Sequence, residues 1–151
     1  MNTIQLIDYL KKDKFANKVF CDVIPLDYLI NHSFKRPCAF IINTHISKLP
    51  GEHWFAIYIP RSGYTEYFDS YGLKPLNEEV YIFFKKNNLK FKWNEHPIQP
   101  SNSINCGKYC LFYIFMRSRG FKLRRIIKFF NKYSKENDIF IDRLFKKLQK
   151  N

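Results

Sequence analysis

Within the segment Gln99-Pro-Ser-Asn-Ser-Ile-Asn-Cys106-Gly-Lys-Tyr-Cys110-Leu-Phe-Tyr-Ile-Phe-Met116, a polar stretch gives way to an apolar run at Cys106. The Pro, Ser and Asn residues before Cys106 are typical of a loop. The apolar run that follows is long enough for about two and a half turns of helix. The sequence therefore predicts a loop followed by a helix that begins at Cys106.

A cysteine at the start of a helix has a chemical consequence. The first backbone N–H groups of a helix lack partners, and the macrodipole places partial positive charge at that end. Both effects favour the thiolate, which lowers the pKa of a cysteine from about 8.5 toward about 3.5–7.5. Gly107, the next residue, leaves room for a substrate backbone. Cys106 is therefore the candidate nucleophile.

A nucleophilic cysteine needs a base, a group that orients the base, and a donor for the oxyanion. Two apolar runs joined by the turn Pro60-Arg-Ser-Gly63 are predicted to form a hairpin: Trp54–Ile59 and Tyr64–Phe68. His53 opens the first run and Asp69 closes the second, so the hairpin brings the two side by side. Gln99 precedes Cys106 in a loop long enough to fold back beside the thiol.

The order of these motifs resembles that of a known family. His53-Trp54, Phe68-Asp-Ser-Tyr-Gly72 and Gln99-x6-Cys106-Gly107 are arranged as in the adenovirus-type cysteine endopeptidases, adenain and its relatives. That family is similar in core fold to the SUMO and ubiquitin-like-protein proteases. The resemblance extends from about Phe15 to Gly120. It implies His53 as base, Asp69 as its orienter, Cys106 as nucleophile and Gln99 as oxyanion donor. It also suggests that Gly51, Trp54 and Gly107 line the substrate cleft.

The resemblance implies a viral or virus-like thiol protease that cleaves capsid or core precursors during virion maturation. Its expected locations are the virion and the host nucleus or cytoplasm. Family members use viral DNA and a capsid-derived peptide as non-metal cofactors. In some members the peptide is held by a disulfide to a cysteine upstream of the glutamine. No cysteine lies between Cys38 and Cys106, so any activating peptide is expected to bind without a covalent bond. The alternatives are a SUMO or ubiquitin-like-protein isopeptidase and an inactive, basic DNA-packaging protein.

The remaining patterns predict a single α+β domain over residues 1–151, with a small mixed sheet packed by helices in a papain-like, adenain-like core. The expected strands, besides the hairpin, are Phe20–Ile24, Cys38–Ile42 and Leu89–Trp93. The expected helices, besides that at Cys106, are 2–12, 77–87, 123–133 and 134–150. Cys38–Ile42 is continuously apolar, which is typical of a strand buried on both faces.

The net charge of +13 is concentrated near the C-terminus. Residues 117–151 hold 12 Lys or Arg against three acids, whereas residues 1–116 hold 14 against ten. Such a basic helical segment favours non-specific binding of DNA through phosphate contacts. Arg124, Arg125 and Lys128 are the candidate DNA-binding residues.

Several residues allow an alternative to the proposed catalytic group. His96 is closer to Cys106 in sequence than His53 but has no predicted acid beside it. Cys106 and Cys110 with two histidines offer four zinc ligands, but they lack the paired spacing of zinc sites, so no metal is expected. The remaining thiols are expected to be inert, and the remaining histidines to face solvent: Cys21, Cys38, His32 and His45. The sequence shows neither a signal peptide nor a membrane span, and we expect an intracellular monomer.

Overall fold

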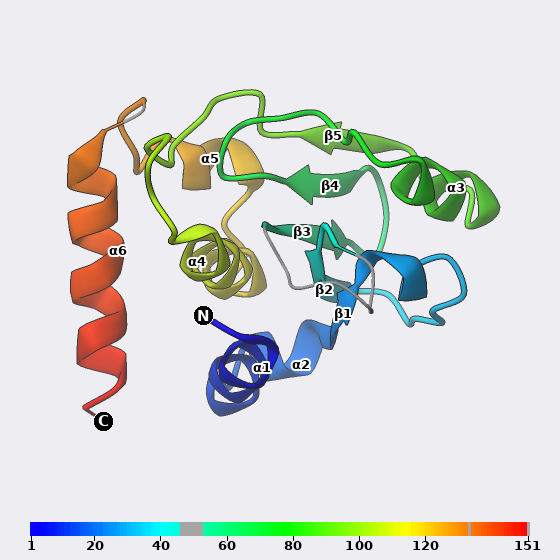
Figure 1. Ribbon diagram of the computed structural model, residues 1–151. Helices are drawn as coiled ribbons and strands as arrows, with labels where there is room; N and C mark the ends of the chain where they lie inside the picture. Colours follow the sequence, from blue (N-terminus) through cyan, green and yellow to red (C-terminus); the bar gives the residue numbers. More distant parts are fainter. Residues whose placement is uncertain (46–52, 133, 151) are drawn as a thin grey trace.

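A five-stranded mixed sheet forms the centre of the protein (Figure 1). The computed structural model describes residues 1–45, 53–132 and 134–150. The strands follow one another across the sheet in chain order: β1 (Phe20–Pro25), β2 (Cys38–Asn43), β3 (Trp54–Ile59), β4 (Thr65–Phe68) and β5 (Phe91–Trp93). The outer pairs, β1 with β2 and β4 with β5, are parallel, and the inner pairs are antiparallel. The predicted α+β architecture with a mixed sheet is confirmed.

Helices cover both faces of this sheet: α1 (Thr3–Lys12), α2 (Ala16–Val19), the 3-10 turn η1 (Leu26–Tyr28), α3 (Glu78–Lys86), α4 (Cys106–Ser118), α5 (Leu123–Ile127) and α6 (Lys135–Leu148). The six residues of β2 are all buried because successive side chains enter different cores. Ala39 and Ile41 pack in the core beneath α4, whereas Phe40 and Ile42 pack in the core beneath α3. The continuous apolar run of this strand is thereby explained.

Helix α4 begins at Cys106, as predicted, and is buried along most of its length. It packs against β2 and β3 and also contacts α1, α2, α5 and α6. At its C-terminal end Arg117 forms an ion pair of 2.7 Å with Glu66 of β4, whose side chain is 1% exposed. Removing one partner of such a buried pair typically costs about 3–5 kcal/mol of stability. The helix that carries the candidate nucleophile is therefore fixed at its far end.

The C-terminal segment differs from the prediction. The helix expected over 123–133 ends at Ile127. Asn137 of α6, 4% exposed, accepts a hydrogen bond from the backbone N–H of Asn131 and donates to the Asn131 carbonyl. These contacts take the backbone groups that a continuing helix would use. The next helix begins as predicted, with Ser134 accepting a hydrogen bond from the N–H of Glu136.

The short elements α2 and η1 were not predicted, since each is held by packing rather than by a periodic pattern of its own. The strand expected from Leu89 begins at Phe91. In the described parts of the chain, no helix has both the length and the apolar character needed to cross a bilayer.

Candidate active site

The β3–β4 hairpin brings His53 and Asp69 together. His53 lies immediately before β3 and Asp69 immediately after β4, and the antiparallel register pairs Ala56 with Phe68. The ends of the two strands are therefore adjacent, and His53 Nε2 lies 2.9 Å from Asp69 Oδ2. Because Nε2 hydrogen-bonds to the Asp69 carboxylate, Nδ1 is the ring nitrogen available to a second partner.

Asp69 is 2% exposed and its carboxylate has two partners. The backbone N–H of Tyr71 donates to Oδ1 at 2.7 Å, which leaves Oδ2 for the imidazole. Burial alone lowers the pKa of His53, but hydrogen bonds to Asp69 and Cys106 outweigh burial and raise the pKa to about 9. His53 is thus an imidazolium at neutral pH, held between an acid and a thiol.

The Cys106 thiol completes the group. Burial raises the pKa of this thiol, but hydrogen bonds from His53 and from the backbone N–H of Trp54 outweigh burial, and the pKa is lowered. The backbone N–H of Gly107, in the first turn of α4, also lowers the pKa of the Cys106 thiol. The surroundings of Cys106 therefore favour a thiolate paired with the His53 imidazolium.

Tyr71 is a component that the sequence analysis did not identify. Its ring lies 5.2 Å from the His53 imidazole, between ring centroids, at an interplanar angle of 31°. Its hydroxyl donates to the Ser103 carbonyl at 3.1 Å, in the loop before Cys106. Tyr71 therefore covers one face of the charged imidazole and ties it to that loop. The Ser-Tyr-Gly turn after Asp69 was the signal in the sequence.

Gln99 lies in the same region but its amide is already engaged. Its side chain is fully buried, and Oε1 accepts a hydrogen bond from Ser70 Oγ. Nε2 donates to the carbonyl oxygen of Ser103 at 3.0 Å and to its Oγ at 3.1 Å. Both amide hydrogens thus face the loop that leads to Cys106. The predicted role as oxyanion donor requires that one of them turn to a substrate oxygen.

The three predicted substrate-binding residues differ in their surroundings. Trp54 is partly buried at the start of β3. A Cβ at Gly107 would lie 3.3 Å from Leu6 and 3.4 Å from the Trp54 ring, so the protein's own side chains occupy the space expected for substrate. Any contact of Gly107 with substrate must therefore use its backbone. Gly51 lies outside the described residues.

The other cysteines fall into two kinds. Cys110 is fully buried, its thiol donates to the Trp54 carbonyl at 3.5 Å, and burial raises its pKa well above the usual value. Cys21 was expected to be inert, and this stays a prediction, although its surroundings differ from those of Cys110. It is half-buried, and a hydrogen bond from the Cys38 thiol lowers its pKa to about 7. Burial and the Cys21 neighbour raise the pKa of Cys38 instead.

The remaining histidines do not compete for the nucleophile. His32, expected to face solvent, instead places Nε2 3.0 Å from Asp22 Oδ2 and its ring edge against Phe40. His96 is exposed and lines a cavity of about 540 Å³ with Arg124 and Lys128. Within residues 1–45, 53–132 and 134–150, no three or more His, Cys, Asp or Glu side chains cluster in a way that could hold a metal ion.

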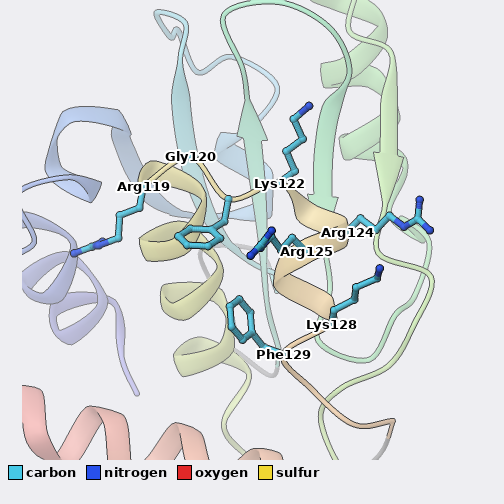
Figure 2. Close-up of a pocket in the computed structure, with 8 residues that line it drawn as sticks. Arg119, Gly120, Lys122, Arg124, Arg125, Lys128 and Phe129 are labelled. Atoms are coloured by element: carbon cyan, nitrogen blue, oxygen red, sulfur yellow. The ribbon is translucent and has the colours of Figure 1, made fainter.

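The predicted DNA-binding residues are all exposed on α5 and the residue after it. They line a groove of about 860 Å³ together with Lys122, Phe121 and Phe129, shown in Figure 2. Arg124 and Lys128 point to one side of the helix, whereas Arg125 points to the other, with its guanidinium 5.8 Å from the Phe121 ring. Arg119 lines the same groove but pairs with Asp13. Arg124, Arg125 and Lys128 thus lie on two sides of α5, and we refer to them as the basic strip around α5.

Comparison with known proteins gives an independent result. No family model matches the chain. It is 32% identical over 106 residues to the cysteine protease S273R of African swine fever virus (isolate Tick/Malawi/Lil 20-1/1983). A protein from the Pig/Kenya isolate, named SUMO-1 cysteine protease S273R, is 31% identical over 106 residues. This chain is similar to viral cysteine proteases. Each match covers 61% of this chain, which spans only 39% of the relative.

Solved structures agree on the fold. The crystal structure of the African swine fever virus pS273R protease matches with a TM-score of 0.61 at 19% identity, over 85% of this chain and 62% of that one. The central domain of Lpg1148 from Legionella pneumophila matches with a TM-score of 0.51 at 15% identity, over 88% and 89%. The predicted protease fold is confirmed. The narrower adenovirus-type assignment stays a prediction.

Proposed function

We propose that this chain is a cysteine endopeptidase. One observation carries the proposal: a single imidazole, that of His53, contacts a buried carboxylate on one side and the Cys106 thiol on the other. Hydrogen bonding and the charge of His53 outweigh burial and lower the pKa of this thiol, which favours the thiolate, the state that attacks a carbonyl. Its position at the N-terminus of α4 adds backbone N–H groups close to the reacting sulfur.

The reaction follows from the positions of these groups. The Cys106 thiolate attacks the scissile carbonyl carbon, and the negative oxygen that forms is held by the Cys106 backbone N–H and the Gln99 amide. His53 then gives its proton to the leaving amine, and an acyl-enzyme remains. The neutral imidazole next takes a proton from water, which attacks the acyl carbon and frees the thiolate. Asp69 holds the imidazole in one tautomer and stabilises its charged form throughout.

The proposed substrates are capsid or core precursors of a virus or virus-like element, cleaved in the virion or in the host nucleus or cytoplasm. The name of the second relative, a SUMO-1 cysteine protease, favours one alternative, an isopeptidase acting on ubiquitin-like tails. Incubation with a peptide library and with a ubiquitin-like precursor separates the two. Cleavage of the folded precursor alone supports an enzyme that recognises ubiquitin-like tails.

Alkylation measures the reactive thiol directly. At pH 6, iodoacetamide is expected to modify Cys106 faster than any other cysteine, because its thiolate is stabilised by His53. Cys21, with its pKa lowered to about 7, is the main competitor, so the experiment is best done in a Cys21→Ser background. Mass spectrometry of the digested protein gives the rate at each site. Equal rates at Cys106, Cys38 and Cys110 would contradict an activated nucleophile and favour an inactive, DNA-packaging protein.

Gln99→Ala is expected to lower kcat by about 10²–10³, the usual effect of removing one oxyanion donor, without slowing alkylation of Cys106. Ser103→Ala removes one of the two acceptors that hold the Gln99 amide, so it tests whether the amide must be released. We expect its effect to be small or favourable. Unchanged turnover in Gln99→Ala would exclude Gln99 from the oxyanion site.

We further propose that the basic strip around α5 binds DNA non-specifically. If about five phosphates are neutralised, log K falls with log salt at a slope of about −4 to −5. Changing Arg124, Arg125 and Lys128 to Gln is expected to reduce the slope by up to about three. Changing Lys11, Lys18 and Lys35 to Gln removes the same charge from exposed positions elsewhere and is the matched control. Equal slopes in the two triple variants would exclude this strip.

A further inference from the structure

One buried side chain satisfies both backbone polar groups of Asp69. Asn94 follows the last residue of β5 and is 5% exposed. Its Oδ1 accepts the Asp69 N–H at 2.9 Å, and its Nδ2 donates to the Asp69 carbonyl at 2.6 Å. The Asp69 N–H needs an acceptor and the Asp69 carbonyl needs a donor, which fixes the orientation of the Asn94 amide. A flipped amide would place its NH₂ group against the Asp69 N–H.

The location of this contact explains why a side chain is needed. The parallel β4–β5 ladder pairs Tyr67 with Trp93, the last residue of β5, and β4 ends one residue after Tyr67. Glu95 then adopts a φ of +47°, so the backbone turns away from β4. Without a neighbouring strand, the buried N–H of Asp69 would lack a partner; the Asn94 amide supplies one and gives the Asp69 carbonyl a donor as well.

The contact belongs to a larger restraint on the turn after β4. Asn94 Nδ2 also donates to the His96 carbonyl at 3.2 Å. A Cβ at Gly72, which has a φ of +70°, would lie 2.6 Å from the Pro97 nitrogen, so the two backbone segments are in close contact. The turn closes through a 2.8 Å hydrogen bond from the Gly72 N–H to the Asp69 carbonyl. That carbonyl is therefore held by Asn94 and by the turn together.

We propose that Asn94 is a positioning residue that fixes the Asp69 backbone and thereby aims its carboxylate at His53. The inference rests on the proposed protease function, in which Asp69 orients the base. Among the described residues, the Asn94 side chain hydrogen-bonds to the backbone of Asp69 and His96, and not to the imidazole or the thiol. It acts on the reaction through Asp69, whose Oδ1 is already taken by the Tyr71 N–H.

The test compares three variants with the wild-type chain. Asn94→Ala removes both contacts, and Asn94→Asp keeps the volume and the acceptor but places an oxygen against the Asp69 carbonyl. Both are expected to lower kcat by about 10- to 100-fold, the effect of a misplacement of about 1 Å, with KM changed less than about threefold. Asn87→Ala is the matched control, because Asn87 also donates from a side-chain amide to a backbone carbonyl, that of Phe83, in another part of the fold.

Two further readouts separate positioning from a general loss of stability. The pH at which Cys106 becomes alkylated is expected to rise in the Asn94 variants and to stay unchanged in Asn87→Ala. In an Asp69→Asn background, Asn94→Ala is expected to cause no further loss of kcat, since it acts through the group already removed. If Asn94→Ala fails to fold, the same measurements are made on Asn94→Asp.

Folded Asn94 variants with an unchanged kcat and alkylation profile would overturn the proposal, as would full additivity with Asp69→Asn. Failure of the proposed function gives a different result. In that case the wild-type chain itself shows no turnover and no selective alkylation of Cys106. If wild-type alkylation is selective but no substrate has been found, the alkylation profile alone decides the role of Asn94.

Discussion

Cys106→Ala is expected to lower kcat for peptide hydrolysis by about 10⁶, because no other described thiol contacts His53. Initial rates on the best library peptide, at matched protein concentrations, give the measurement. Circular dichroism is expected to show an unchanged fold, since the substitution only shortens a side chain at the first residue of α4.

Cys110→Ala is the matched control for this variant. Cys110 lies one turn further along α4 and is fully buried against the Trp54 carbonyl. The same substitution there creates a small cavity and lowers the melting temperature, but turnover is expected to remain. If Cys106→Ala retains activity while Cys110→Ala loses it, the nucleophile has been assigned to the wrong residue.

Asp69→Asn is expected to lower kcat by up to about 10⁴, because an amide neither stabilises the imidazolium nor selects its tautomer. The pH profile of activity shows in which direction the pKa of His53 has moved. Asp69 is one of the groups that raise the pKa of His53 to about 9, so activity in the wild-type chain is lost only as the pH rises through that value. In the variant this limb is expected to move to lower pH.

Asp22→Asn provides the comparison for Asp69→Asn. Asp22 also contacts a histidine, with Oδ2 3.0 Å from His32 Nε2, but Asp22 lies on β1. The variant removes the same charge from a similar pair and is expected to leave the pH profile unchanged. A similar loss of kcat in both variants would mean that Asp69 acts only through overall stability or charge.

The parts of the site that could be predicted depend on short-range rules. The hairpin places His53 beside Asp69, since a short turn, residues 60–64, joins the two strands that they flank. The change from polar loop to apolar helix located Cys106 at the start of α4. Both inferences used only neighbours in sequence, and such local signals are the most reliable ones in a chain.

The parts that were missed depend on contacts between distant segments. Asn94 meets Asp69 only because β5 pairs with β4, and the sequence does not reveal which strands pair. The Cys21 thiol is perturbed by Cys38 across the β1–β2 pairing, which apolar strand composition did not indicate. The short α5 has the same cause, since Asn137 of the following helix binds the backbone at Asn131.

The burial of α4 has a consequence for how the site can move. This helix is fixed by the Glu66–Arg117 pair at one end and packs against the sheet and α1 along its length. Its amides therefore belong to the slowest-exchanging class, which opens only when the whole domain unfolds. Gln99, in contrast, is held by serine hydrogen bonds in a loop. A substrate can thus reshape the oxyanion side of the site while the nucleophile stays in place.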